Sequence, residues 1–436
     1  MKRLIIFMGV AATLSFMSFA QDSSEIVRKI SIDDAVVLAA ENNISLKRQK
    51  ITLDTLERRN KTSWNGISPS VSLNGRWSKS LDGIVTDYDA PDGYNYSVGA
   101  DVNLSLTPSL YTSIVDAKIK YEAGKVAYEE AERQVELSVR KLFYSLLYSQ
   151  ESINLQKRNM ETARLRYENN RDKYNRGQLS ELDLLQSQYS YESQRPAIES
   201  AEISYQNSLA SFKQTLGIPQ NEKIELEGAL EANLPTAELK IGKTVDDLFS
   251  IKKLKAGIVQ QKNSLLSTRF SAYAPSITAS YAYSLAGSNE TKDLKSHKET
   301  QSISLGVRIP LDGMLPWSTG ALSVANQKSN LKDLELQLEN ERTTLELNLQ
   351  NSIKNIELKQ NQMQLLNRNV EIAQKTYDMT LAAYNHGSRD LLTLQNASDA
   401  LMKAKLDRQS HIYNLICAIF DLENTLGLPF GSLGKE

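Results

Sequence analysis

The sequence predicts a mixed α+β membrane protein built as an internal tandem repeat, in which each copy combines two strands with a long helical hairpin. The first observation is a turn motif that occurs twice at an offset of 210 residues, beginning at Tyr174 and at Tyr384. The second is a set of four segments in which apolar and polar residues alternate, as they do in β-strands. The third is an N-terminal segment typical of secreted proteins.

Composition excludes several classes of function. The chain has 436 residues and a formal net charge of −1, so no basic field indicates a nucleic-acid partner. Its single cysteine, Cys417, excludes an intrachain disulfide framework. The three histidines lie far apart, and no nucleotide-binding, metalloprotease or hydrolase motif is present. We therefore expect no enzyme, no catalytic residues, no metal ligands and no cofactor.

Residues 1–20 have the features of a signal peptide. Lys2 and Arg3 precede an apolar run, and Ser18–Ala20 is a small-x-small cleavage site. The alternative is a membrane anchor, but the apolar run is too short to span a bilayer well. We expect the mature chain to begin near Gln21, beyond the inner membrane.

A helix is predicted after Ser31, which can cap a first turn that contains acidic residues. We expect this helix to reach about Trp64, with an interruption at 42–43. Residues 244–247 repeat the same capped start in the second half of the chain.

Four alternating segments, at about 69–78, 96–106, 277–285 and 302–309, predict strands. A half-buried sheet would show the same alternation, but four matched strands behind a signal peptide favour an outer-membrane β-barrel. The loops 82–95 and 287–300 would then be extracellular. The residues expected to face lipid are Val71, Leu73, Val98, Val102, Leu104, Ile303 and Leu305. The residues expected to face the lumen are Asn74, Arg76, Asp101, Asn103, Ser304 and Arg308.

After Pro108 the period becomes helical for about 65 residues, a length of about 100 Å. A seven-residue ladder from Ile114 to Leu142 steps by four residues into a second ladder, from Leu146 to Tyr174. Such a stutter locally unwinds a left-handed coiled coil. The second repeat shows the same ladders at the same offset, so two equivalent long helices are expected.

The return helices, at about 180–216 and 390–426, are shorter than the long helices. Pro196 should bend the first of them. Stacked end to end on the helices at 32–64 and 245–271, they would match the long helix in height. Each repeat would then be two antiparallel rods, one of them broken midway.

Each long helix should end at a glycine turn, at Gly177 and at Gly387, because glycine readily adopts the left-handed backbone of a helix C-terminus. Ser180 and Ser388 can cap the helices that follow. The sequence therefore predicts two helical hairpin tips.

A single chain cannot complete this architecture. Four strands cannot close a barrel, for which about eight is the practical minimum, and an open sheet edge cannot face lipid. Several copies must therefore pool their strands. Long helices with one apolar seam also require lateral partners.

The chain resembles the TolC-type outer-membrane efflux proteins over nearly its whole mature length. The matching features are the acid-capped first helix, the Pro-Ser strand starts, the Tyr-x-x-Gly tips, the Leu-Gly-hydrophobic-Pro repeat ends and the duplication. The resemblance implies a homotrimer in the outer membrane of a Gram-negative bacterium. It also implies a trimeric outer-membrane β-barrel, with four strands from each chain, continuous with a long periplasmic α-helical barrel. Its partners would be a periplasmic adaptor, an inner-membrane transporter and outer-membrane lipid.

With this architecture, the chain divides into a signal peptide at 1–20, a first repeat at 21–219, an equatorial connection at 220–243 and a second repeat at 244–436. The resemblance further implies that the tips meet the adaptor and close the tunnel through polar links. The positions of those links hold Asp183, Tyr384 and Arg389. The family's polar partner before the aspartate is Leu182 here, and its acidic ring falls on Thr393 and Asn396. The alternative is that Asp183 only caps its helix and that Arg389 is a solvated charge.

Three functions fit this reading. The first is a passive exit duct for small molecules or drugs within a tripartite export system. The second is an outer-membrane conduit for type I protein secretion, which the same tunnel would serve. The third is a secreted coiled-coil structural protein without a pore, which explains the heptads but not the four strands.

Overall fold

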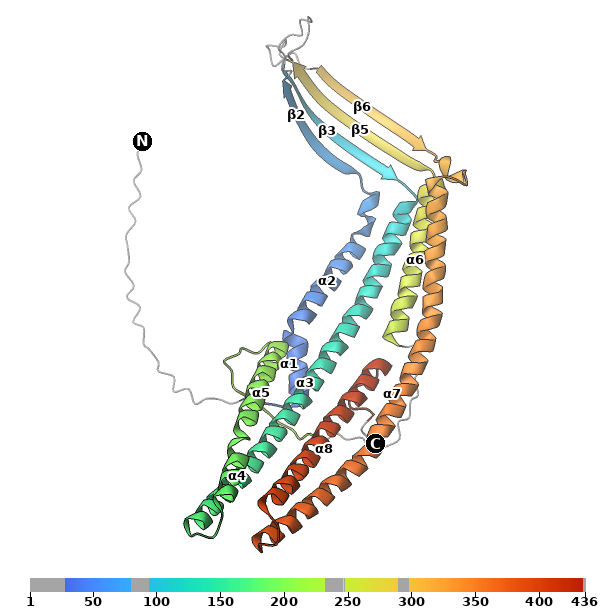
Figure 1. The fold of residues 1–436 in the computed structure, drawn as a ribbon. Helices are drawn as coiled ribbons and strands as arrows, with labels where there is room; N and C mark the ends of the chain where they lie inside the picture. The colour runs from blue at the N-terminus through green and yellow to red at the C-terminus, as the bar shows by residue number, and fades with distance from the viewer. Residues whose placement is uncertain (1–27, 80–93, 232–245, 247, 289–297, 434–436) are drawn as a thin grey trace, which may run out of the picture.

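The structure is a computed structural model that describes residues 28–79, 94–231, 246, 248–288 and 298–433. The predicted signal peptide lies outside these residues, and so do most of the two predicted extracellular loops. A β-sheet stands at one end of the molecule, and two helical hairpins form the other end (Figure 1). No helix within the described ranges is long and apolar enough to cross a membrane.

The first helical rod is interrupted where the sequence predicts it. Helix α1 (Ile32–Asn42) begins at a capping box, in which the side chains and backbones of Ser31 and Asp34 bond reciprocally. Asn43 ends α1 and caps α2 (Ile44–Lys61) through a 2.9 Å bond from the Ser45 amide. The side-chain amide nitrogen of Asn43 donates to the Thr215 carbonyl oxygen at 2.9 Å. The interruption therefore joins the rod to the helix stacked below it.

A short 3-10 turn, η1 (Ser63–Ile67), leads into the sheet. The four strands of the sheet are all antiparallel to their neighbours, in the order β2-β3-β5-β6. The central pair joins the two repeats, since β3 belongs to the first and β5 to the second. The strands are β2 (Ser70–Lys79), β3 (Tyr94–Leu106), β5 (Ser276–Ser288) and β6 (Lys298–Arg308).

The long helices confirm the predicted duplication. Helices α3 (Ser109–Asn175) and α7 (Thr319–Asn385) each have 67 residues, so each spans about 100 Å. The first return segment is split into α4 (Glu181–Glu192) and α5 (Arg195–Leu216), with a proline in the first turn of α5. Pro196 therefore breaks the helix at the predicted place, because its ring cannot be accommodated within a helix interior.

Two predicted helix starts differ from the structure. Helix α6 (Phe249–Tyr273) begins after Leu248, several residues beyond the predicted start at 244–247, which lies almost wholly outside the described residues. Helix α8 (Leu391–Leu426) is capped by Asp390, whose carboxylate accepts the Thr393 amide at 2.8 Å. Ser388 does not cap α8, because its hydroxyl donates back to the carbonyl oxygen of Ala383 at 2.9 Å.

The largest apolar core lies at mid-height, where α1, α3, α5 and α8 meet. Its fully buried members include Phe143, Phe212 and Ile412. Beside it, β1 (Arg28–Ile30) pairs in parallel with β4 (Ile224–Leu226), a contact that the sequence did not reveal. Only β4 belongs to the segment expected to form the equatorial connection, and its pairing with β1 holds the N-terminal segment against the core.

Candidate functional site: strand faces and hairpin tips

The strand register places the two predicted residue sets on opposite faces of the sheet. Val71 lies opposite Val102, and Tyr281 lies opposite both Val102 and Ile303, so these four residues share one face. Asn103 and Ser304 both lie opposite Ser280 on the other face. The apolar face is open: Leu73 is 83% exposed, and Ile303 is 84% exposed.

The opposite face carries polar side chains that bond to one another. The side-chain amide of Asn74 donates to the carboxylate of Asp101 across strands β2 and β3. Ser70 donates its hydroxyl to the Asn103 carbonyl oxygen at 3.2 Å. Both outer strands, β2 and β6, are edges of the four-stranded sheet within one chain. The sheet can therefore be extended at each edge by another copy.

Each hairpin tip is a left-handed glycine turn. Gly177 and Gly387 have φ values of 68° and 73°, which glycine tolerates and most other residues do not. At the first tip, Gln178 N donates to the carbonyl oxygen of Lys173, and Gly177 N to that of Tyr174, both at 2.8 Å. This is the hydrogen-bond pattern of a Schellman motif. A Cβ atom at either glycine would meet nothing within 4 Å, so the requirement is for backbone geometry and not for space.

Near the tips, polar contacts link α3 to α7. The hydroxyl of Tyr384 donates to the amide oxygen of Asn170 at 3.1 Å. The Nζ of Lys173 lies 5.7 Å from the centre of the same ring. One heptad before Tyr384 on α7, the hydroxyl of Tyr377 accepts a weak 3.4 Å bond from the guanidinium of Arg166. Sequence reasoning identified Tyr384 but not Asn170, because an asparagine within a long helix gives no signal of a partner on another helix.

The two charged gate residues, Asp183 and Arg389, each interact with neighbours that are close in the sequence. Ser180 donates its hydroxyl to the Asp183 carboxylate at 2.6 Å and accepts the Asp183 amide at 3.2 Å, so both residues take part in capping α4. None of the hydrogen bonds between described residues joins Asp183 to Tyr384 or Arg389. The hydrogen bond from Thr393 lowers the pKa of Asp390, and the charge of Arg389 acts in the same direction.

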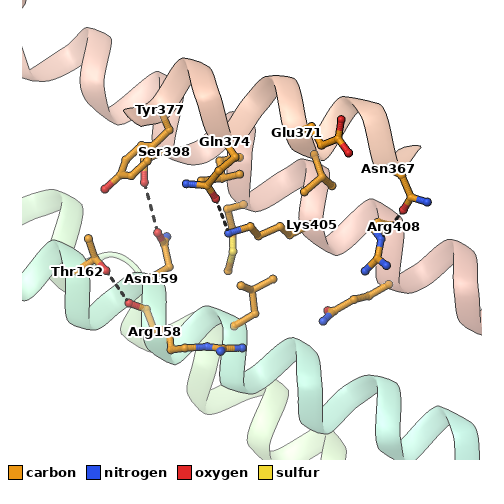
Figure 2. A pocket seen from close by; sticks show the side chains of 15 residues that line it. Arg158, Asn159, Thr162, Asn367, Glu371, Gln374, Tyr377, Ser398, Lys405 and Arg408 are labelled. Atoms are coloured by element: carbon orange, nitrogen blue, oxygen red, sulfur yellow. Dashed lines mark hydrogen bonds between the residues drawn. The ribbon is translucent and has the colours of Figure 1, made fainter. Parts of the chain in front are cut away.

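A groove of about 730 Å³ separates the first hairpin from the second below the apolar core. Figure 2 shows its walls, formed by α3 on one side and by α7 and α8 on the other. Its cations already have partners: Lys405 donates to Gln374 at 3.0 Å, and Arg408 to Asn367 at 2.7 Å. Across the groove, the hydroxyl of Ser398 donates a long 3.4 Å hydrogen bond to the side-chain oxygen of Asn159. A second hydrogen bond between the hairpins in this region runs from the side-chain nitrogen of Gln409 to the carboxylate of Glu151 at 3.3 Å.

Several solved structures have the same fold as this chain. A model of the family described as "Outer membrane efflux protein" matches residues 35–218 and 259–427. The Campylobacter jejuni CmeC outer membrane channel has a TM-score of 0.75 at 17% identity, over 91% of this chain and 85% of that chain. The open state of the Neisseria gonorrhoeae MtrE outer membrane channel has a TM-score of 0.72 at 16% identity, over 91% and 89%. For the outer membrane protein VceC of Vibrio cholerae the values are 0.68 and 13%, over 92% and 96%. No curated protein matches the sequence.

Proposed function

The chain belongs to the outer membrane efflux protein family, and we propose that it is the passive exit duct of a tripartite export system for small molecules or drugs. It is an outer-membrane protein of Gram-negative bacteria that extends into the periplasm. The observation that supports the proposal is that the helical hairpins and the sheet are continuous with each other. In each repeat, a long hairpin runs directly into half of one sheet, so a barrel and a tunnel would be a single conduit (Figure 1).

The working form is a homotrimer. One copy supplies a sheet of four strands with free edges at β2 and β6. Unpaired backbone groups at such edges cannot face hydrocarbon, and a barrel with a usable lumen needs about eight strands or more. Three copies that pair β2 with β6 around an axis meet both requirements. The apolar face would then contact lipid, and the face with Asn74, Asp101 and Arg308 would line the lumen.

The periplasmic adaptor would meet the hairpin tips, and the inner-membrane transporter would supply the energy. The turns at Gly177 and Gly387 are open to solvent, so their backbones are accessible to a partner. Asp183, Tyr384 and Arg389 would hold the resting entrance closed, with Asp183 and Arg389 paired between neighbouring copies. Near the tips, the hydrogen bonds from Tyr384 to Asn170 and from Arg166 to Tyr377 are contacts that would have to break for one hairpin to move against the other when the adaptor binds.

The proposal is tested in a strain that lacks this protein and in the same strain expressing it. Expression should lower the cellular accumulation of a fluorescent efflux substrate, and purified heat-resistant trimers should conduct ions in planar bilayers. Loss of a secreted protein from the medium, with unchanged dye accumulation, would instead indicate a conduit for type I protein secretion. Trimers without conductance would contradict a channel of any kind.

A further inference from the structure

The segment between β6 and α7 exposes an unusual density of large apolar side chains. Five of the nine residues from Ile309 to Trp317 are large, apolar and exposed, and Trp317 is 81% exposed. The turn that carries them projects sideways from the junction of sheet and helices (Figure 1). The five residues are Ile309, Leu311, Met314, Leu315 and Trp317.

This exposure is not the result of a loosely attached loop. The segment contains a 3-10 turn, η3 (Asp312–Met314), and bonds at 3.1 Å from Met314 N to Leu311 O and at 3.0 Å from Ser318 N to Leu315 O. Gly313 is buried against the end of α6, where an added Cβ would lie only 2.1 Å from the Ala272 carbonyl oxygen. The backbone is therefore fixed on the protein while the apolar side chains point away from it.

We propose that residues 309–317 form an interfacial wedge that inserts into the periplasmic leaflet of the outer membrane, at the level of the phospholipid headgroups. Continuity with the sheet is the first argument. Ile303, Leu305 and Val307 occupy the apolar face of β6, and Ile309 is the next alternate position. The wedge therefore extends the face that the barrel turns toward lipid.

Length places the wedge at the membrane edge. Strand β6 has 11 residues, and a tilted strand of about 9–11 residues crosses the hydrocarbon core. The chain thus leaves the hydrocarbon near Arg308, and the wedge follows immediately. Between Arg308 and Lys328 the only charged residue is Asp312. A tryptophan among aliphatic side chains suits the interfacial zone, where tryptophan is enriched.

The test uses tryptophan fluorescence in the full-length protein. The chain has three tryptophans, so Trp64→Phe with Trp77→Phe leaves Trp317 as the sole emitter. Trimers would be reconstituted in phosphatidylcholine vesicles brominated near the headgroup or near the acyl-chain end. A headgroup-level wedge should lose clearly more of its fluorescence to the shallow bromines than to the deep ones, because interfacial apolar groups lie near the boundary between headgroups and acyl chains. The matched Trp64→Phe, Trp317→Phe protein retains Trp77 on the apolar sheet face and sets the scale for a lipid-facing side chain.

Two outcomes overturn the wedge. Quenching of Trp317 by aqueous iodide but not by brominated lipid would place the segment in the periplasm. Quenching by neither would mean that a neighbouring copy covers it. If the tryptophan replacements reduce trimer yield, a spin label at Met314→Cys, with Cys417→Ser, gives an independent measurement. Lipid contact at the headgroup level predicts more access for oxygen and less access for a nickel chelate than a label at the solvent-exposed hairpin tip shows. Accessibilities equal to those at the tip, or access for neither reagent, contradict it.

Discussion

The hydroxyl of Tyr384 donates a 3.1 Å hydrogen bond to the side-chain oxygen of Asn170. The two residues are 214 positions apart in the sequence, and their bond joins the two hairpins near the tips. Asn170 is only 1% exposed. Its amide nitrogen is buried without a hydrogen-bond partner among the described residues. Among the described residues, Tyr384 is therefore the hydrogen-bond partner of this side chain, and loss of the bond would leave the amide oxygen unpaired as well.

We expect Tyr384→Phe to loosen the two hairpins near the tip. A neutral hydrogen bond contributes about 0.5–1.5 kcal/mol, which corresponds to a shift of about 2–13-fold in the ratio of open to closed entrances. Single-channel recordings of reconstituted trimers should show this as a higher resting open probability. Tyr174→Phe is the control, since Tyr174 is the equivalent tyrosine of the first repeat and is 39% exposed. Equal open probabilities for both variants and the parent would contradict the contact's role in closure.

Two substitutions at a tip glycine can distinguish the effect of turn geometry from the effect of a changed side chain. Gly177→Val places a β-branched residue at φ 68°, at a cost of about 1–2 kcal/mol, and should distort the turn. Gly177→Asn is the matched variant, because asparagine tolerates the left-handed region better than other residues. We expect trimers in the membrane for both variants but export only for the asparagine variant. Normal export by the valine variant would show that the first tip is not where the adaptor docks.

The two faces of the sheet can be distinguished by cysteine labelling in a Cys417→Ser background. Asn103→Cys should react with a water-soluble thiol reagent through the lumen, and Val102→Cys should not. Val102→Arg should destabilise the barrel by about 2–4 kcal/mol if it lies near the bilayer midplane. The reverse labelling pattern would show that the lumen and lipid faces have been exchanged.

The sequence could predict the sheet and the hairpins because both carry a repeated period. Alternation with a period of two assigns Val102 and Asn103 to opposite faces before any pairing is known, and the register agrees. The heptads and the tandem offset likewise predict the equal lengths of α3 and α7. These features are local, so no knowledge of distant contacts is needed.

Other features depend on contacts that no local pattern reveals. The three-residue strands β1 and β4 are too short to show a period, and they are paired across almost 200 residues of chain. Asp390 caps α8 in preference to Ser388 because Ser388 is occupied by the preceding turn. Asn170 became a candidate only when the structure placed it beside Tyr384.

The C-terminal segment is held by a buried carboxylate whose ionisation should affect stability. Glu423 is fully buried and accepts the amides of Gly431 at 2.8 Å and Leu433 at 2.9 Å. Burial raises the pKa of Glu423 above its ordinary value of 4.5, although these hydrogen bonds oppose the shift. The folded chain therefore holds this proton more tightly than the unfolded chain. The resulting stabilisation is present below pH 4.5 and is lost as the pH rises through the raised pKa.

Glu423→Gln provides the comparison, because glutamine does not ionise. We expect the stability of the parent relative to this variant to fall as the pH rises from about 4.5 toward neutrality. Thermal unfolding followed by circular dichroism at several pH values measures the difference. A difference that is constant or that grows over this range would show that Glu423 is ionised in the folded chain with an ordinary or lowered pKa.

The last prediction concerns the gate residues Asp183 and Arg389. Exposed ion pairs contribute only about 0.2–1 kcal/mol each, so three pairs around a trimer would hold a closed state that an adaptor can still open. Asp183→Ala with Arg389→Ser should therefore raise resting conductance and admit bulky solutes from the periplasmic side. The replacement also weakens the cap of α4, since the Asp183 carboxylate accepts the Ser180 hydroxyl at 2.6 Å. Ser180→Ala removes that cap alone, and we expect it to leave conductance at the parental value. A double variant with parental conductance and trimer yield, or a Ser180→Ala variant that leaks equally, would refute an ion-pair gate.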